Sequence, residues 1–234
     1  MSSPLVLLVG GRLTSGKDAF ADHLVAKHGF VKLGMSDTLA DALYRLNPIL
    51  DTGPSATVGL WRVHPTNIWN NLKVVLTGKG NFKDWVISRG EFARYQGLVD
   101  KVGYVEAKKN LEVRRLLQAL GTEVGRELLG ENIWVEAAKK KILELTAAGH
   151  NVVITGIRFP NEIALEQQLN TGHIVAASVW VDRPSLPPLE AGHSSETSVG
   201  RNDFEYGLDN TGTLEDLYEA ADALLSEVRA DYDV

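Results

Sequence analysis

Short apolar runs alternate with longer stretches of helical periodicity along most of the chain. The first run, Leu5–Val9, is apolar at every position, which is typical of a strand buried on both faces of a parallel sheet. Four similar runs predict further strands, at residues 30–33, 151–155, 174–181 and 204–208. Apolar positions three or four apart predict helices over residues 18–28, 36–46, 111–129, 133–148, 161–169 and 213–230. Because strands alternate with helices, we expect an α/β fold of three layers (α/β/α), with a mainly parallel five-stranded sheet in the middle.

Residues 48–94 interrupt this rhythm. Prolines and glycines recur through the segment, together with Trp61, Trp69 and Trp85. Such a composition is too aromatic for a flexible linker and too broken for long helices. We therefore expect an insertion that packs on the main body of the domain, and its aromatic content is compatible with a homodimer contact.

Composition narrows the classes of protein that fit. The 234 residues carry a formal net charge of −6 and include no cysteine. The acidic balance disfavours nucleic acid as a partner, and the lack of cysteine excludes thiolate metal sites and cysteine nucleophiles. No apolar run approaches the ~20 residues of a membrane span, and none resembles a signal peptide. The chain is expected to be a soluble intracellular protein with no membrane partner.

Residues Gly11–Lys17 match the pattern G-x-x-x-x-G-K, directly after the first predicted strand and directly before the first predicted helix. In that context the glycines let backbone N–H groups surround phosphate oxygens, and the lysine contacts the β- and γ-phosphates of a nucleotide. The next residue is Asp18, where such loops usually have a serine or threonine that binds Mg²⁺. Two roles stay open for Asp18: a metal ligand, directly or through water, or a cap of the helix.

Among proteins with a phosphate loop, the rest of the sequence favours a small-molecule kinase. A GTPase would carry an N-K-x-D motif, which does not occur in the chain. A motor-type ATPase would have an acidic residue at the end of an apolar strand, but the run Val152–Thr155 leads into Gly156. Arg158 and Arg183 follow the ends of two predicted strands, where open α/β sheets bind ligands. Arginine suits bidentate phosphate binding, so these two are predicted phosphate contacts.

The run Arg-Arg-Leu-Leu-Gln-Ala-Leu-Gly-Thr-Glu, which begins at Arg114, is the most specific of six sequence blocks outside residues 48–94. Together these blocks resemble those of phage-type deoxynucleoside monophosphate kinases. Phosphomevalonate kinases share the Gly-Lys-Asp loop and a helix with paired arginines, and are the nearest family with which this one can be confused. The six blocks are Gly11–Asp18, Glu112–Arg126, Asn132–Trp134, Gly156–Glu162, His193–Glu196 and Asp209–Leu214.

The resemblance implies ATP-dependent phosphorylation of a deoxynucleoside 5′-monophosphate, with Mg²⁺ as the metal and nucleotides as the small-molecule partners. It implies one P-loop kinase domain over residues 1–234, with a monophosphate-binding and insertion region at 36–130 and a lid at 183–203. It also implies a cytoplasmic location, in the host cell if the chain is encoded by a phage.

The same resemblance assigns expected roles to individual residues. Lys17, Arg158 and Arg183 are the expected catalytic residues, with Arg158 between the two substrates and Arg183 in the lid. Asp18 is the expected metal ligand. The expected ATP contacts are Gly11, Thr14, Ser15, Gly16, Lys17 and Asp18 at the phosphates, with Asn210 and Thr213 near the adenine. The expected acceptor contacts are Ser36, Asp37, Arg114, Arg115, Gln118, Trp134 and Arg158.

One position departs from the family pattern. An aspartate is expected where Gly156 stands, so Asp18 or Asp182 would have to take over the orientation of the metal. In the lid, His193 and Glu196 fit two roles, ordering the closed lid or forming a solvated pair. The other histidines show no ligand spacing and are expected at the surface or in turns: His23, His28, His64, His150 and His173.

Two alternatives stay open. The first is a kinase for another phosphorylated small molecule or for a modified base in DNA. The second is a nucleotide-binding module that keeps the loop and has lost catalysis, which the missing aspartate favours. The arginines favour a working kinase, because a binding module has no need for charge at the transferring phosphoryl group.

Overall fold

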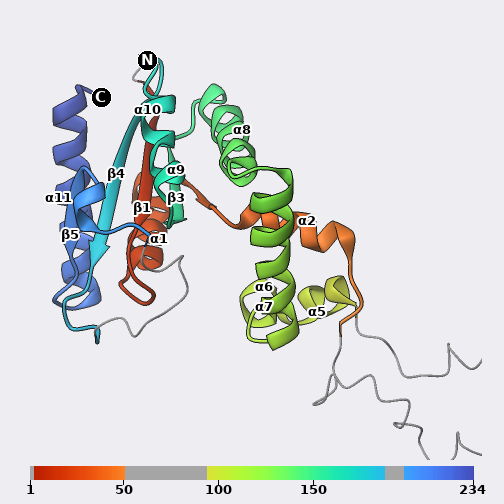
Figure 1. Cartoon of the computed structure of the whole chain (residues 1–234). Helices are drawn as coiled ribbons and strands as arrows, with labels where there is room; N and C mark the ends of the chain where they lie inside the picture. The colour runs from red at the N-terminus through yellow and green to blue at the C-terminus, as the bar shows by residue number, and fades with distance from the viewer. Residues whose placement is uncertain (1–2, 51–93, 188–197) are drawn as a thin grey trace, which may run out of the picture. The chain divides into compact units, whose positions relative to one another are not determined.

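The computed structural model describes residues 3–50, 94–187 and 198–234 (Figure 1). Most of the predicted insertion at 48–94 lies outside the described residues. The same holds for the middle of the predicted lid at 183–203, with His193 and Glu196. No helix in the described part of the chain is long and apolar enough to span a membrane.

The chain divides into two compact units. The larger unit consists of residues 1–40 and 121–234, and the smaller unit of residues 41–120. The phosphate-loop motif therefore belongs to the larger unit, and the paired arginines Arg114 and Arg115 belong to the smaller one.

The larger unit is built on a five-stranded sheet in which every neighbouring pair of strands is parallel. Its strand order is β2-β3-β1-β4-β5, which confirms the predicted parallel sheet of five strands. Because all strands run the same way, their carboxyl ends meet at one edge. The strands are β1 (Leu5–Gly10), β2 (Val31–Gly34), β3 (Val152–Ile157), β4 (Val175–Asp182) and β5 (Tyr206–Asp209).

Helices cover both faces of this sheet, as predicted (Figure 1). Helices α1 (Lys17–His28) and α11 (Leu214–Tyr232) pack on one face. The sequence predicts one helix over 161–169, whereas the structure has two short helices separated by Ala164. Both lie on the other face of the sheet, together with a longer helix. These three are α8 (Ile133–Ala147), α9 (Pro160–Ile163) and α10 (Leu165–Leu169).

The central strand β1 explains why its sequence is apolar throughout. Leu5, Leu7 and Val9 pack into the core under α1 and α11. Val6 and Leu8 point the opposite way, into the core under α8 and α10. Since successive side chains of a strand alternate between faces, a strand covered on both sides needs apolar residues at every position.

The smaller unit is helical in its described part, and has a core of its own. Buried Leu43, Leu50, Tyr95 and Val113 form that core. Sequence analysis predicted two of the four helices in this described part and left the two between residues 95 and 107 unassigned. The four helices are α5 (Tyr95–Val102), α6 (Tyr104–Ala107), α7 (Leu111–Gln118) and the second half of α2 (Asp37–Leu46), which begins in the larger unit.

The second half of the predicted helix at 111–129 differs from expectation, because Ala119–Leu129 is a π-helix. Its wider turn is closed by a bond from Gly130 N–H to the Gly125 carbonyl oxygen, five residues back. Trp134 lies against this turn and donates from Nε1 to the Gly121 carbonyl oxygen at 2.9 Å. A Cβ on Gly125 would lie 2.4 Å from Trp134 Nε1, so glycine lets the indole pack against the helix backbone.

Candidate active site

The segment between β1 and α1 is a tight loop that requires glycine at two positions. Gly11 and Gly16 have φ values of 147° and 104°, which L-residues rarely adopt, and the exposed Thr14 also has a positive φ of 63°. A Cβ on Gly11 would lie 2.5 Å from the Val181 carbonyl oxygen, and one on Gly16 would lie 2.5 Å from Asn210 Nδ2. The backbone path and its close neighbours therefore both require the two glycines of the motif.

The loop holds polar groups that lack partners. The hydroxyl of Ser15 is buried without a hydrogen-bond partner, and so is Nε of Arg12. An unpaired buried group of this kind costs about 1–3 kcal/mol. Lys17 is only 8% exposed, and its Nζ donates to the Arg12 carbonyl oxygen at 3.0 Å. Unsatisfied polar groups beside a lysine suit the binding of an anion rich in oxygen.

Asn210 connects this loop to the end of the sheet. Its Nδ2 donates to the Ser15 carbonyl oxygen at 2.9 Å, and its backbone N–H donates to the Asp182 carbonyl oxygen at 2.7 Å. Asn210 is buried, so these bonds are shielded from water. Thr213, the other residue expected near the adenine, caps α11, since its hydroxyl accepts from Asp216 N–H at 3.2 Å.

Asp18 lies in the first turn of α1 with its side chain 68% exposed. Its carboxylate is 3.2 Å from Lys32 Nζ, which also lies 2.9 Å from the carboxylate of Asp22. Burial opposes the charge of Lys32, but the two carboxylates raise its pKa. A metal at Asp18 would have to compete with this lysine.

Gly156 has a backbone conformation that disfavours the aspartate expected there. Its φ is 87°, and the register between β1 and β3 shifts at this point. Val9 pairs with Thr155 and Gly10 pairs with Ile157, which leaves Gly156 as the extra residue of a β-bulge. An L-residue in this region is strained by roughly 1–2 kcal/mol. The glycine that replaces the expected aspartate at position 156 thus coincides with a β-bulge in β3.

The backbone at Arg158, just beyond β3, is held by a buried carboxylate. Glu162 accepts the Arg158 N–H at 2.7 Å and the Phe159 N–H at 3.2 Å. Burial raises the pKa of Glu162, while these two N–H groups and the arginines Arg126 and Arg158 act in the opposite direction. The guanidinium of Arg126 stacks 4.0 Å from the centre of the Phe159 ring and also reaches Asn161 Oδ1 at 3.4 Å.

Sequence analysis did not single out Arg126 and Glu162, although both lie inside the resembling blocks. A signal was present for Glu162, because an acidic residue in the first turn of a helix commonly reaches back to free backbone N–H groups. The contacts of Arg126 with Phe159 and Asn161 gave no such signal, because these two residues lie more than 30 residues away along the chain.

Two other predicted site residues in the larger unit carry local structural contacts. Asp37 accepts the Gly34 N–H at 2.6 Å and so stabilises the start of α2, next to the exposed Ser36. Asp182, the last residue of β4, accepts the N–H of Arg183 at 2.9 Å, and the Arg183 side chain is exposed.

The predicted acceptor residues of the smaller unit lie on α7. Arg114 and Gln118 are exposed and four residues apart, so they share one face of the helix. Arg115 makes two parallel hydrogen bonds to the carboxylate of Glu112, at 2.8 and 2.7 Å. In the larger unit, Trp134 is half-buried and its N–H is already bonded.

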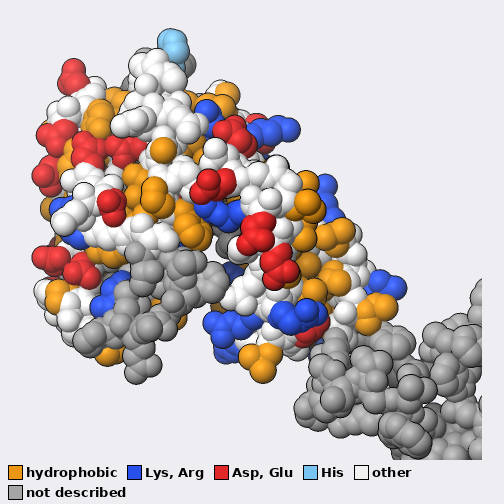
Figure 2. All heavy atoms as spheres, viewed as in Figure 1, with side chains coloured by type: hydrophobic (Ala, Val, Ile, Leu, Met, Phe, Trp, Pro, Cys, Tyr) orange, Lys and Arg blue, Asp and Glu red, His pale blue; other side chains and the backbone are white. Residues whose placement is uncertain are grey.

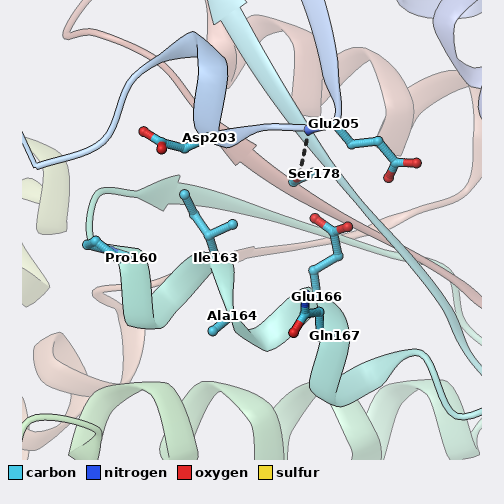
Figure 3. Close-up of a pocket in the computed structure, with 8 residues that line it drawn as sticks. All are labelled: Pro160, Ile163, Ala164, Glu166, Gln167, Ser178, Asp203 and Glu205. Atoms are coloured by element: carbon cyan, nitrogen blue, oxygen red, sulfur yellow. Dashed lines mark hydrogen bonds between the residues drawn. The ribbon is translucent and has the colours of Figure 1, made fainter.

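A cavity of about 320 Å³ lies beside α9, α10 and β4 (Figure 3). Its walls include three carboxylic acids, Glu166, Asp203 and Glu205, while Ser178 accepts the Glu205 N–H at 3.0 Å. Burial raises the pKa of Glu166, Ser178 opposes the shift, and neighbouring Glu205 adds to it. An acidic lining repels phosphate, so this cavity is not a candidate nucleotide site.

The surface along α11 is acidic as well. Figure 2 shows acidic side chains gathered at the left of the view, where α11 runs in Figure 1. An acidic surface of this kind repels phosphate, so the surface along α11 is not a candidate nucleotide site. The exposed carboxylates of α11 are Glu215, Asp216, Glu219, Glu227 and Asp231.

Comparison with two phage kinases agrees with the resemblance. The chain is 22% identical over 237 residues to the deoxynucleotide monophosphate kinase of Enterobacteria phage T4, covering 91% of this chain and 95% of that kinase. It is 43% identical over 92 residues to the deoxynucleoside-5′-monophosphate kinase of Escherichia phage T5, covering 37% of this chain and 34% of that kinase. Among solved structures, the dephospho-CoA kinase from Campylobacter jejuni aligns with a TM-score of 0.42 and 13% identity, over 95% of this chain and 96% of that one.

A family model described as deoxynucleotide monophosphate kinase matches residues 67–221, which is more than half of the chain. The match includes α7, with the paired arginines, and β3, with the turn at Arg158. The phosphate loop lies before the matched residues. The chain belongs to the deoxynucleotide monophosphate kinase family.

Proposed function

We propose that this kinase transfers the γ-phosphoryl group of ATP to a deoxynucleoside 5′-monophosphate, with the loop Gly11–Asp18 as the site of the donor phosphates. The observation that carries the proposal is the buried, unpartnered hydroxyl of Ser15. It lies in a loop whose glycines are required by the backbone path and whose lysine is held over the loop backbone. A phosphate oxygen would satisfy that hydroxyl.

Three cationic residues would stabilise the charge of the transferring group. Lys17 would contact the donor phosphates, and Arg158 would bridge donor and acceptor, with its backbone fixed by Glu162. Arg183 would close over the phosphates with the lid. Phosphoryl transfer needs mainly positioning and charge neutralisation, so these residues and not a general base would supply most of the catalysis.

The acceptor monophosphate would be recognised by Arg114, Arg115 and Gln118. Arg114 is an exposed cation, and Gln118 on the same face of α7 offers an amide that can bond to a base edge. Arg115 would exchange part of its pairing with Glu112 for the acceptor phosphate. Trp134 would add a stacking surface for the base, alongside Ser36 and Asp37.

The oxygen donors near the loop fit Mg²⁺, which prefers hard oxygen ligands and keeps several waters. The carboxylates of Asp182 and Asp18 would act directly or through water. When bound, Mg²⁺ neutralises charge on the donor phosphates. We further propose that the enzyme acts in the cytoplasm, where free nucleotides are found.

Replacement of Lys17 tests the proposal. Lys17→Ala should lower kcat by about 100-fold or more in an assay of ADP release with ATP, Mg²⁺ and a panel of monophosphates, because it removes charge at the transferring group. Lys140→Ala, which removes an exposed lysine of α8, is the matched control and should keep wild-type turnover.

Two results would speak against the proposal. Wild-type turnover by a correctly folded Lys17→Ala variant would remove the loop from the mechanism. Tight ATP binding by the wild-type chain, with no transfer to any acceptor of the panel, would instead favour the nucleotide-binding module.

A further inference from the structure

Two histidines and one aspartate converge between α1 and α11, away from the phosphate loop's own residues. Nε2 of His23 lies 2.9 Å from Asp222 Oδ1, and Nε2 of His28 lies 2.7 Å from the same oxygen. One potential ligand atom from each residue lies within 4.8 Å of the others. Within the described residues, no other group of three such side chains comes together in this way.

The surroundings hold these side chains in place. The ring of His23 stacks on Tyr218 with 4.4 Å between centroids, and its side chain is only 11% exposed. Lys27 Nζ lies 2.7 Å from Asp222 Oδ2, so the outer oxygen is occupied and Oδ1 faces the histidines. Hydrogen bonds from His28, Lys27 and His23, in that order of effect, hold the pKa of Asp222 well below its usual range.

We propose that His23, His28 and Asp222 form a binding site for a divalent transition-metal ion of the Zn²⁺ type. Imidazole nitrogens with one carboxylate oxygen are ligands that Zn²⁺ accepts, and three protein ligands leave a fourth position for water. Zinc–ligand bonds of about 2.0–2.1 Å place tetrahedral ligand atoms roughly 3.3 Å apart. The present separations of 2.7 and 2.9 Å would therefore open by well under 1 Å.

Coordination would replace the two hydrogen bonds that the histidines make to Asp222. A neutral imidazole that binds metal through Nε2 carries its proton on Nδ1, so each ring changes tautomer and loses no net proton. Lys27 would stay on Oδ2 and hold the carboxylate in a monodentate orientation. The ion is distinct from the Mg²⁺ of the reaction, because two of its three ligands are imidazole nitrogens and all three lie on other residues.

The expected consequence is a link between the two helices that flank the phosphate loop. Helix α1 begins at Lys17, and α11 follows Asn210, whose side chain bonds to the loop. An ion that binds the folded state but not the unfolded chain stabilises the fold in proportion to its concentration over Kd. The site would therefore raise Tm without taking part in phosphoryl transfer.

Zinc titration of the full chain tests the proposal, by competition with a chromophoric chelator and by the rise in Tm on zinc addition. The wild-type chain should bind one Zn²⁺ that the variants Asp222→Asn and His28→Gln bind at least about 10-fold more weakly, since one of three ligands is lost. His173→Gln, which removes an exposed histidine elsewhere, should bind as the wild type does. Cobalt should give the visible absorption of a tetrahedral complex in the wild type and not in Asp222→Asn.

The metal-induced change is compared within each variant, because Asp222→Asn also removes contacts of Lys27, His23 and His28. A variant that is less stable without metal but gains nothing from zinc supports the site. Absence of zinc binding by the wild type overturns the proposal. Zinc binding of equal strength in the wild type, Asp222→Asn and His28→Gln overturns it as well, because the ion then binds at other residues.

Discussion

The phosphate loop of the larger unit and the arginine face of α7 in the smaller unit prepare for phosphate in different ways. The loop is shaped by backbone: two glycines that neighbouring atoms require, a buried hydroxyl and a lysine held over the turn. The face of α7 consists of exposed side chains on an ordinary helix, and Arg115 is already paired with Glu112. The proposed donor site is thus preorganised, while the proposed acceptor site depends on side chains that still have to be ordered.

This comparison predicts that backbone changes in the loop have the largest effect. Gly16→Ala should lower kcat/KM for ATP by about 100-fold or more, because a Cβ would collide with Asn210 and displace the loop. Gly172→Ala is the matched control, since Gly172 also has a positive φ, of 81°, but nothing lies within 4 Å of its Cβ position. It should lose roughly 1–2 kcal/mol of stability from strain and keep its kinetics. Equal kinetic loss in both variants would mean that strain alone, and not the loop, explains the result.

A side-chain change on α7 should have a smaller and more selective effect. Arg114→Ala should raise KM for the monophosphate by about 10-fold or more, the value of one charge-assisted hydrogen bond, with KM for ATP unchanged. Lys109→Ala, which removes another exposed cation of the smaller unit, should leave both constants as they are. A parallel rise of both constants in Arg114→Ala would contradict the separation of donor and acceptor residues.

The smallest effect on catalysis should come from a substitution in the acidic cavity, which lies outside both proposed phosphate sites. The folded-state pKa of Glu166 is raised above the ordinary value of 4.5, chiefly by burial. The stability that this group contributes is therefore present below pH about 4.5 and is lost as the pH rises through the raised pKa. Glu166→Gln should flatten that part of the stability–pH profile in denaturant titrations and leave kcat unchanged. An identical profile in both proteins would show that the carboxyl does not titrate as described.

Much of the fold could be predicted from the sequence, because local pattern determines it. The continuous apolar run of β1 follows from a strand covered on both faces, and the motif Gly11–Lys17 follows from the backbone path that the loop needs. The π-helix Ala119–Leu129 was predicted as an ordinary helix, because the spacing of apolar residues does not distinguish its wider turn and Trp134, which bonds to Gly121, lies outside that segment.

The side-chain clusters that were not predicted from the sequence depend on contacts between segments far apart in the chain. His23 and His28 are five residues apart on one helix, a spacing that suggests no metal site, and they were expected at the surface or in turns. Their partner Asp222 is more than 190 residues away, so the cluster exists only because α11 packs on α1. Arg126 is likewise recognisable only once Phe159 and Asn161 lie beside it.

Phosphoryl transfer by this chain can be followed directly with the radiolabelled γ-phosphate of ATP, supplied with each deoxynucleoside and ribonucleoside monophosphate and with phosphomevalonate. We expect label in one or a few deoxynucleoside diphosphates, in a reaction that needs Mg²⁺ and is lost in Lys17→Ala. Transfer to phosphomevalonate alone, or no transfer to any acceptor by a chain that still binds ATP, would contradict this expectation.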